Sequence, residues 1–542
     1  MNTCLIRSCT LFLLVSLLSP FGSVSSQLLP EEEVSVLKTI SSKLGNKYWN
    51  VSRASCTQGR GFNMTDPTYD KIISNVTCDC SFNNRSVCHV VTIQLKGLNM
   101  TGILPPEIAE LTHLRELDLS RNFLNGSIPS SYGQLHITIL SLLGNRISGP
   151  IPKELGDIDT LEQLNLENNL LEGPLPPNLG SLRSLKEMFL SANTLTGTIP
   201  ENFRNLKNMT DFRIDGNGIS GIIPDFIGNW TNLDRLDIQG TSMEGPIPPK
   251  ISLLKNMSEL RISDLRGKQM QFPNLQGLTK MNRLILRNCS LVGPIPKYVG
   301  DMPLKLLDLS NNMLNGTIPD TFARLDFDNM FLGNNTLSGP IPGWMFGSRE
   351  NIDISYNNFT QTSTPGCQSS TLNLVSSYSD TMNKFNNTDS WCSMKGLICP
   401  TEAKYHSLFI NCGGTRTKFE GNDYEEDLTK FGPSYFFSSS DKWAFSSSGV
   451  YVGLQDANYI ATNTFSLNIS GADFYKTARL APNSLKYYGL CLRAGSYRVR
   501  LHFAEIMYSN DSTYSSLGRR IFDVAIQVSL RTNVFVNNKY VT

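Results

Sequence analysis

The sequence lacks the residues from which a catalytic centre is usually built. No VAIK, HRD or DFG segment is present, which excludes a protein-kinase centre within these 542 residues. Only five histidines occur, and none lies in an HExxH motif or near a GxSxG serine. The neighbouring carboxylates Glu425 and Glu426 are better explained by a solvated turn than by a glycosidase pair. We therefore predict no enzyme activity, no catalytic residue, no cofactor and no metal site in this chain.

An excess of charge of one sign and long apolar runs are also missing. The 48 basic and 47 acidic side chains leave a net charge of +1, and no basic run is present, so we predict no nucleic-acid partner. Beyond residue 26 no stretch approaches the ~20 apolar residues that a membrane-spanning helix needs. Residues 1–26 resemble a secretory signal, with Arg7 before an apolar core and small residues at the end. The sequence therefore predicts a secreted chain.

Asn-x-Ser/Thr sequons are frequent, as on a glycosylated extracellular surface. Some of them lie in asparagine-rich turns of the repeat described below and would arise there in any case. The glycosylation candidates are Asn50, Asn63, Asn75, Asn84, Asn99, Asn125, Asn208, Asn229, Asn256, Asn288, Asn315, Asn334, Asn358, Asn386, Asn468 and Asn510.

Most of the cysteines lie in clusters on either side of a repetitive stretch, as expected for an oxidising compartment. A zinc site would need CxxC or a histidine partner at suitable spacing, and neither is present. We therefore predict disulfides, with the pairing left open. Cys289 stands inside the repetitive stretch, and we expect it to be a buried free thiol. The disulfide candidates are Cys56, Cys78, Cys80, Cys88, Cys367, Cys392, Cys399, Cys412 and Cys491.

The dominant pattern is a repeat of roughly 22 to 24 residues, present about twelve times between residues 90 and 358. Residues 117–129, 164–176 and 307–319 share the form LxLxxNxLxGxxP. This is the period of a leucine-rich repeat, in which stacked short strands bury leucines that no single unit can cover. The Gly-x-Ile-Pro turn that recurs at one phase resembles the plant-specific type of this repeat, whose members form superhelical ectodomains.

The asparagine column of the repeat has a structural reason. After each strand the chain turns inside the protein, and the asparagine amide supplies donors and an acceptor for backbone groups there. Thr241 can still form a hydrogen bond in this column, whereas we expect local adjustment at Leu98, Leu265 and Cys289. Residues 267–273 lack the turn motif, which predicts an irregularity in that repeat.

Two columns of charge follow the predicted concave strands. One column is Asp211, Arg235, Glu259, Arg283, and the other is Arg213, Asp237, Arg261. Because adjacent strands lie ~4.8 Å apart, each charge has neighbours of opposite sign, and a ladder of exposed ion pairs explains any one of them. The functional alternative is a polar recognition strip with Phe189, Ile285 and Phe331 as exposed apolar anchors. The candidate ligand-binding residues of the repeats are therefore Phe189, Arg213, Arg235, Arg261 and Phe331.

The remaining parts divide the chain into five segments. Residues 1–26 are the signal, and residues 27–89 form an N-terminal cysteine cap whose helix begins near Pro30 and ends near Leu44. Residues 90–358 are the repeats, residues 359–404 a C-terminal cap and linker, and residues 405–542 a further domain. In this domain, apolar and polar residues alternate as in half-buried strands, for example in residues 497–506 (YRVRLHFAEI).

The last domain carries a specific resemblance. Residues 407–414 (SLFINCGG), 449–453 (GVYVG), 497–506 and 520–524 (RIFDV) resemble a malectin domain. The order of repeats, cysteine-containing linker and malectin domain resembles the extracellular half of plant leucine-rich-repeat receptor-like serine/threonine kinases. The fold prediction is thus an α/β leucine-rich-repeat solenoid, a parallel-sheet superhelix, followed by an all-β malectin-like sandwich. We expect the pattern to fail after about Gln527, which would leave this sandwich truncated and less stable than the repeats.

The resemblance implies an extracellular ligand-binding ectodomain that senses a cell-wall oligosaccharide or a peptide, with co-receptor ectodomains as further partners. It places the chain in the apoplast, or on the outer face of the plasma membrane if a longer form has a span. Sugars stack on aromatic rings, so Tyr435, Phe436, Phe437, Trp443 and Tyr508 are candidate ligand residues. Three successive aromatics cannot all face inward on a strand, so residues 435–437 can be either a ligand platform or part of the core.

Two other interpretations stay open at this point. Plant-type repeats also form secreted inhibitors of wall-degrading enzymes, although such inhibitors do not usually carry a malectin domain. The chain can also be an incomplete record of a transmembrane serine/threonine kinase.

Overall fold

The computed structural model describes residues 27–62, 74–360, 371–377 and most of 404–536. Gaps in the last range are residues 431, 439–441, 452–457, 464, 466–471, 494, 505, 508–519 and 527–528. Several sequence predictions therefore lie outside the described residues: the signal, Asn63, Cys367, Asn386, Cys392, Cys399, Asn468, Tyr508 and Asn510.

The N-terminal cap closes one end of the solenoid. Its predicted amphipathic helix is present as α1 (Glu31–Leu44), which buries Leu37 and Ile40 against the first repeat and ends at Gly45 in the left-handed conformation. Strand β1 (Asn75–Ser81) pairs antiparallel with β2 (Val87–Gln94), and the short helices α2 (Ser55–Gln58) and α3 (Phe82–Arg85) flank them. Disulfides Cys56–Cys78 and Cys80–Cys88 join this cap.

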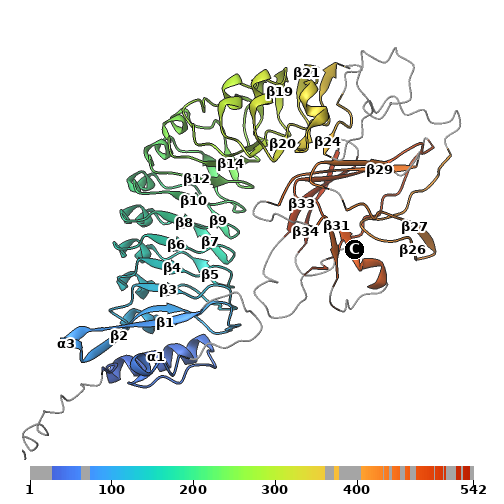
Figure 1. Cartoon of the computed structure of the whole chain (residues 1–542). Helices are drawn as coiled ribbons and strands as arrows, with labels where there is room; N and C mark the ends of the chain where they lie inside the picture. The colour runs from blue at the N-terminus through green and yellow to red at the C-terminus, as the bar shows by residue number, and fades with distance from the viewer. Residues whose placement is uncertain are drawn as a thin grey trace, which may run out of the picture.

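The repeats stack into one sheet of 14 strands that runs from β1 to β24. From β2 onward each strand pairs in parallel with the next, as the repeat predicts. The strands are β3 (Glu116–Asp118), β4 (Ile139–Ser141), β6 (Gln163–Asn165), β8 (Glu187–Phe189), β10 (Asp211–Arg213), β12 (Arg235–Ile238), β14 (Glu259–Ser263), β16 (Arg283–Arg287), β18 (Leu306–Asp308), β20 (Asn329–Phe331), β22 (Asn351–Asp353) and β24 (Leu372–Asn373). They form a curved stack from α1 to β24 (Figure 1).

The rest of most repeats forms a short second strand and a 3-10 helix. These strands are β5 (Ser148–Pro150), β7 (Leu170–Pro174), β9 (Thr194–Thr196), β11 (Ser220–Ile222), β13 (Ser242–Glu244), β15 (Met270–Gln271), β17 (Leu291–Pro294), β19 (Met313–Gly316), β21 (Thr336–Pro340) and β23 (Asn358–Thr360). The helices are η1 (Pro106–Glu110), η2 (Ser130–Gln134), η3 (Lys153–Asp157), η4 (Pro177–Ser181), η5 (Glu201–Asn205), η6 (Asp225–Asn229), η7 (Pro249–Leu253), η8 (Lys297–Asp301), η9 (Asp320–Arg324) and η10 (Gly343–Gly347). Each helix follows a proline of the turn motif, whose fixed φ suits that position.

The asparagine ladder forms as predicted. Asn145 Nδ2 donates to the carbonyls of Leu119 and Leu142 at 3.1 and 3.0 Å, and its Oδ1 accepts a 3.0 Å bond from the Leu124 amide. Cys289 corrects one expectation, because its thiol donates to the carbonyls of Ile262 and Arg287 at 3.5 and 3.3 Å and so takes the place of the asparagine. It is a buried free thiol, as predicted, and burial raises its pKa to about 12.

The predicted irregularity lies between η7 and η8. In this fully described stretch the repeat at residues 265–288 forms no 3-10 helix, and the second layer of strands is interrupted between β13 and β15. Gly267 has φ +107°, a conformation that L side chains rarely adopt. The same stretch lacks the Gly-x-Ile-Pro turn that precedes most of the 3-10 helices.

The C-terminal part, residues 404–536, is built from small sheets. Their strands are β25 (Ile410–Asn411), β26 (Thr417–Phe419), β27 (Asn422–Glu426), β28 (Tyr435–Ser438), β29 (Trp443–Ser448), β30 (Ile460–Thr462), β31 (Thr477–Arg479), β32 (Ser484–Gly489), β33 (Arg520–Ile526) and β34 (Ser529–Val536), with the 3-10 helix η14 (Ala472–Tyr475). Strands β28, β29 and β32 form an antiparallel sheet, and β33 pairs antiparallel with β34. This part lies beside the last strands of the curved stack (Figure 1).

A buried ion pair lies inside the C-terminal part. The guanidinium of Arg479 and the carboxylate of Asp427 are both fully buried, with Nη2 2.5 Å from Oδ1, and the Tyr487 hydroxyl donates to Asp427 Oδ2 at 2.6 Å. Cys412 lies in the same interior as a free thiol, and burial raises its pKa to about 11. The prediction of a disulfide at Cys412 is therefore wrong, whereas Cys491 is disulfide-bonded.

Candidate ligand-binding face

The predicted charge ladder lies on strands β10 to β16, and these strands pair in the predicted register. Asp211 pairs with Arg235, Arg235 with Glu259, and Glu259 with Arg283 along one column. Arg213 pairs with Asp237 in the neighbouring column. Opposite charges therefore alternate both along and across the sheet.

The centre of this ladder is buried, which corrects the expectation of exposed ion pairs. Asp237, Glu259 and Arg261 are 2 %, 8 % and 8 % exposed. Arg261 Nη1 lies 3.4 Å from Asp237 Oδ2, and its Nη2 forms a second ion pair with Glu259. The concave curvature brings long side chains of adjacent strands together, so they cover one another. Arg283, at the edge of the ladder, keeps a side chain that is 41 % exposed.

Acidic side chains outnumber basic ones at the N-terminal end of the ladder. Burial raises the pKa of Asp215 to about 6, and the Asp237 carboxylate adds to this shift. Burial likewise raises the pKa of Glu167, and burial followed by repulsion from Asp211 raises that of Glu187. This end of the face therefore favours a group that brings positive charge.

The two predicted aromatic anchors are not exposed. Phe189 is 7 % exposed, because the guanidinium of Arg213 lies over its ring with Cζ 4.2 Å from the centroid. Phe331 is 1 % exposed and packs with Ile285 and Leu306, and Val450 of the C-terminal part covers this group. The expectation of exposed anchors is wrong because Arg213 of the next repeat strand covers Phe189 and Val450 of the C-terminal part covers Phe331.

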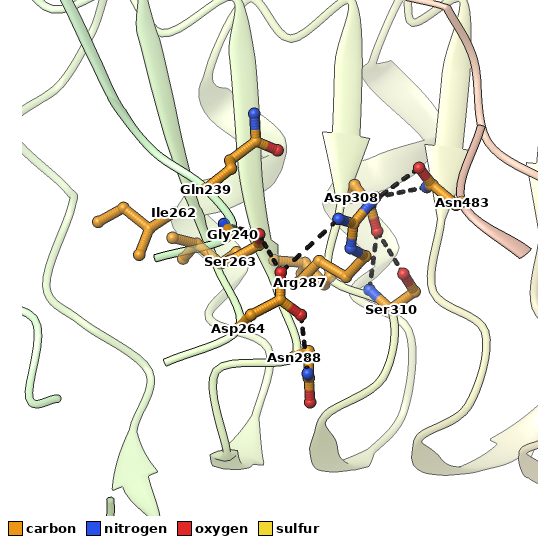
Figure 2. Close-up of polar contacts among 12 residues, drawn as sticks. Gln239, Gly240, Ile262, Ser263, Asp264, Arg287, Asn288, Asp308, Ser310 and Asn483 are labelled. Carbon is orange, nitrogen blue, oxygen red and sulfur yellow. Dashed lines mark hydrogen bonds and ion pairs between the residues drawn. The ribbon is translucent and has the colours of Figure 1, made fainter. Parts of the chain in front are cut away.

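The C-terminal part contacts the repeats through a bridging amide (Figure 2). Asn483, just before β32, accepts a 2.8 Å hydrogen bond from Arg287 Nη1 and donates a 3.0 Å bond to Asp308 Oδ2. Asp308 also accepts bonds from Ser310, and burial raises its pKa although Arg287 opposes the shift. Figure 2 shows Arg287 lying between Asp264 and Asp308.

A small cavity of about 120 Å³ lies at this contact. The repeats contribute apolar and polar walls to it, and the C-terminal part contributes two residues. The lining consists of Gln239, Ile285, Arg287, Leu306, Asp308, Phe331, Val450 and Asn483. The cavity is smaller than the ~300 Å³ or more typical of drug-sized ligands, so its size suits a single side chain.

A second contact lies further along the sheet. Val375, Phe436 and Ala444 are buried together, and Tyr356 and Tyr488 from the two parts pack against them. The buried amide of Asn373 donates a 2.9 Å bond to Ser446 Oγ. Lys486 Nζ lies 3.8 Å from the centroid of the Tyr356 ring, and burial lowers its pKa. This contact covers the last strands of the concave sheet.

The aromatic candidates of the C-terminal part are mostly core. Tyr435 and Phe437 face Phe445 within the sheet β28–β29–β32, whereas Phe436 points to the other side and is 4 % exposed. The three successive aromatics are all accommodated because the repeats cover the second side of this sheet. Trp443 is fully buried and donates a 2.9 Å bond to Glu425 Oε2. No open aromatic platform is formed by these four residues, and Tyr508 lies outside the described residues.

Sequence reasoning missed the contact residues Arg287, Asp308, Val450 and Asn483. Asp308 continues the column of Arg213, Asp237 and Arg261 beyond Ile285 and could have been traced from it, whereas Arg287 lies in a neighbouring column opposite Ser263. Val450 and Asn483 carry no such signal, because they lie in loops whose position depends on how the two parts pack.

The described sequons are accessible. Asn99 is half-buried, and the other described sequon asparagines are exposed: Asn50, Asn75, Asn84, Asn125, Asn208, Asn229, Asn256, Asn288, Asn315, Asn334 and Asn358. Exposure permits glycosylation at these positions, which stays a prediction.

Among the described residues no helix is both long and apolar enough to cross a membrane. In that same part of the chain no cluster of three or more His, Cys, Asp or Glu could hold a metal ion.

Two family models match the chain. The malectin domain model matches residues 406–535 and so extends a few residues beyond Gln527, near which the family pattern is expected to fail. The leucine-rich repeat model matches residues 113–135, 160–182, 184–206 and 303–325. Solved structures with a likeness to the chain include that of PEPR1–AtPEP1, at TM-score 0.49 and 25% identity, covering 61% of this chain and 49% of that one. Another is the Arabidopsis receptor kinase HAESA ectodomain with an IDA peptide, at TM-score 0.44 and 23% identity, covering 60% and 62%.

Curated relatives match nearly the whole chain. Three probable LRR receptor-like serine/threonine-protein kinases of Arabidopsis thaliana are 61%, 55% and 46% identical and cover 96%, 96% and 94% of it. The chain spans about half the length of these relatives, 50%, 50% and 52%. The chain therefore contains leucine-rich repeats and a malectin domain, and it is similar over nearly its whole length to about half of each of these probable leucine-rich-repeat receptor-like serine/threonine kinases.

Proposed function

We propose that this chain binds a peptide on the concave face of its repeats, over β8 to β16, as the extracellular ligand-binding part of a plant receptor kinase. The observation that carries the proposal is the charged face itself, on which opposite charges alternate from strand to strand. Strands β8 to β16 present carboxylates and guanidiniums in alternation, and Arg283 keeps an exposed guanidinium at the edge.

The chemistry of this face suits a peptide better than a neutral sugar. Charges that alternate on neighbouring strands can pair with a peptide that carries charges of its own. Burial is the main cause of the raised pKa of Asp215 and Glu187, and repulsion from the carboxylates of Asp237 and Asp211 adds to it, so a basic side chain of a ligand would offset that repulsion. Of the aromatic residues that would stack on a sugar, Phe436 and Trp443 are buried, and Tyr435 and Phe437 are half-buried against Phe445, which supports the same choice.

The remaining roles follow from the relatives. We propose an extracellular location at the plant cell surface, where the ligand would be captured, and a co-receptor ectodomain as a second partner. Phosphorylation of serine and threonine would belong to the longer protein, as the names of the relatives suggest.

A retention experiment tests the choice of ligand. The purified chain is immobilised and exposed to plant apoplastic fluid that has been treated with either protease or glycan hydrolases, and retained molecules are identified by mass spectrometry. We expect protease-sensitive molecules to be retained by the native chain and lost with Arg283→Glu, whose side chain is 41 % exposed on the face. The matched control is Arg324→Glu, a 67 % exposed arginine on η9 away from the sheet. Retention of only glycan-sensitive molecules, equal in both variants, would contradict the proposal.

A further inference from the structure

We propose that Ile285, Leu306 and Phe331, with Arg287 and Asp308 beside them, form a ligand subsite that the chain's own tip now occupies. The tip consists of Gly449, Val450 and Asn483, which lie in two loops of the C-terminal part. The subsite takes a peptide segment that presents an aliphatic side chain next to a carboxamide. This inference rests on the proposed function, because the subsite continues the same concave face.

The tip itself shows which chemistry fits. Val450 packs its aliphatic side chain on the apolar patch of Ile285, Leu306 and Phe331. The Asn483 amide accepts from Arg287 and donates to Asp308, so both ends of a carboxamide are recognised. A carboxylate at this point would lose the donor to Asp308, and an ammonium group would lose the acceptor for Arg287.

The two loops of the tip form one unit. The backbone N–H of Asn483 donates a 3.1 Å hydrogen bond to the backbone carbonyl of Ser448, which joins the two loops at their base. Gly449 has φ +104°, and a Cβ at this position would lie 2.6 Å from Asn483 N. Val450 and Asn483 are thus held together and would leave the repeats together.

The repeats keep their own polar partners when the tip leaves. Asp308 accepts bonds from the Ser310 amide and hydroxyl at 3.0 and 2.6 Å. Arg287 lies 3.9 Å from Asp264 and 4.0 Å from Asp308. No charge would therefore be left without an opposite charge nearby, and the cost of departure is mainly the exposure of the apolar patch. The cavity of about 120 Å³ beside the tip shows that the contact is incompletely filled.

The second contact between the two parts differs in this respect. Val375, Phe436 and Ala444 are close-packed, and Asn373 bonds to Ser446 in a fully buried position. This contact can remain as a pivot while the tip withdraws. Strand β16 carries both Arg283 of the charged face and Ile285 of the patch, so a peptide lying along the face reaches the vacated subsite.

Thiol labelling of the full chain tests whether the tip leaves. Leu306→Cys places a thiol under the tip, and the native free thiols Cys289 and Cys412 report opening of the repeats and of the C-terminal part. Each labelling rate is divided by the rate in denaturant, so that differences in thiol reactivity cancel. We expect the L306C thiol to be at least about tenfold less protected than either native thiol, and Asn483→Ala to lower its protection further. Equal protection of all three thiols would overturn the proposal, because the tip would then be a permanent interface.

N-acetyl-valinamide is the minimal probe of the ligand chemistry. In saturation-transfer NMR we expect it to contact the N483A chain more strongly than the native chain, and to lose contact when Leu306→Asp is added. Absence of contact with the N483A chain would overturn the assigned ligand class, and so would contact unaffected by L306D. Arg283→Glu separates this result from the proposed function, since it should abolish peptide retention on the charged face while leaving the protection of L306C unchanged.

Discussion

Asp308 of β18 accepts a 3.0 Å hydrogen bond from Asn483, which lies 175 residues further along the chain. The same amide accepts a bond from Arg287, whose Nη1 is 4.0 Å from Asp308 Oδ2. A neutral side chain thus bridges two charges that belong to adjacent repeat strands. The contact ties the C-terminal part to the charged columns of the repeats, where the ligand face ends.

Replacing this amide should uncouple the two parts. Asn483→Ala removes two hydrogen bonds to charged groups, a loss of about 1–3 kcal/mol from the docked C-terminal part. In differential scanning calorimetry we expect the transition of the C-terminal part to move to lower temperature, while that of the repeats stays in place. Ser484→Ala, at the neighbouring position, should leave both transitions unchanged. A single transition that shifts as a whole would contradict the expectation.

The centre of the charge ladder should matter for stability as well as for binding. Arg261→Ala removes the most buried guanidinium that pairs with Asp237 and Glu259 and leaves Asp237 with Arg235 alone, and we expect a loss of about 3 kcal/mol in urea unfolding. Arg283→Ala removes a half-exposed partner of Glu259, and the expected loss is below about 1 kcal/mol. Equal losses for the two variants would show that burial does not decide their contribution.

The repeats could be predicted in detail because their period fixes both core and register. The column of Asn122, Asn145 and Asn169 identified the ladder, and the pairing of Asp211 with Arg235 followed from it. The polarity of cysteine alone predicts a poor substitute at Cys289, whereas its position allows the thiol to reach two carbonyls.

Cover supplied by distant residues could not be predicted. Phe331 was expected on an open concave face, and it is covered by Val450, 119 positions later in the sequence by their numbers. The sequence leaves Phe436 open between ligand platform and core, because a strand at the surface of one domain buries only one of its two sides. Here the repeats bury the second side as well. Such contacts depend on how two folded parts pack, and neither part carries a local signal for its partner.

Asp215 should make the stability of the repeats depend on pH. Burial raises its pKa in the folded chain to about 6 from 3.8, so between these values the folded chain binds more protons than the unfolded chain, and stability falls as pH rises. The penalty is complete above about pH 6. Asp215→Asn should therefore stabilise the chain at pH 7.5 by roughly 1–2 kcal/mol and have no effect near pH 4. This gain is smaller than the whole pKa shift multiplied by ~1.4 kcal/mol per pKa unit, because solvent screens the charge. Urea unfolding at the two pH values measures the difference. The exposed Asp225→Asn on η6 is the control, and a gain of equal size at both pH values would show that the titration of Asp215 is not the cause.

Asn312 offers the most direct test of the ladder. Its Oδ1 accepts bonds from the amides of Cys289 and Leu291 at 2.9 and 3.1 Å, and its Nδ2 donates to the Leu286 carbonyl at 2.7 Å. Asn312→Ala would leave these buried backbone groups unpaired, at about 1–3 kcal/mol for each group that water cannot reach. We expect a loss of at least about 3 kcal/mol in urea unfolding of the repeats. The labelling of Cys289, whose amide loses its acceptor, should also become faster.

The matched control for Asn312 is Asn315→Ala, three positions later, whose exposed side chain should contribute less than about 0.5 kcal/mol in unglycosylated protein. A loss at Asn312 as small as that at Asn315 would mean that the repeat turns find other partners for their amides and carbonyls. The asparagine column would then reflect only the conformation of the turn. Residues other than asparagine, including apolar ones, would be tolerated there, as Cys289, Leu98 and Leu265 already are.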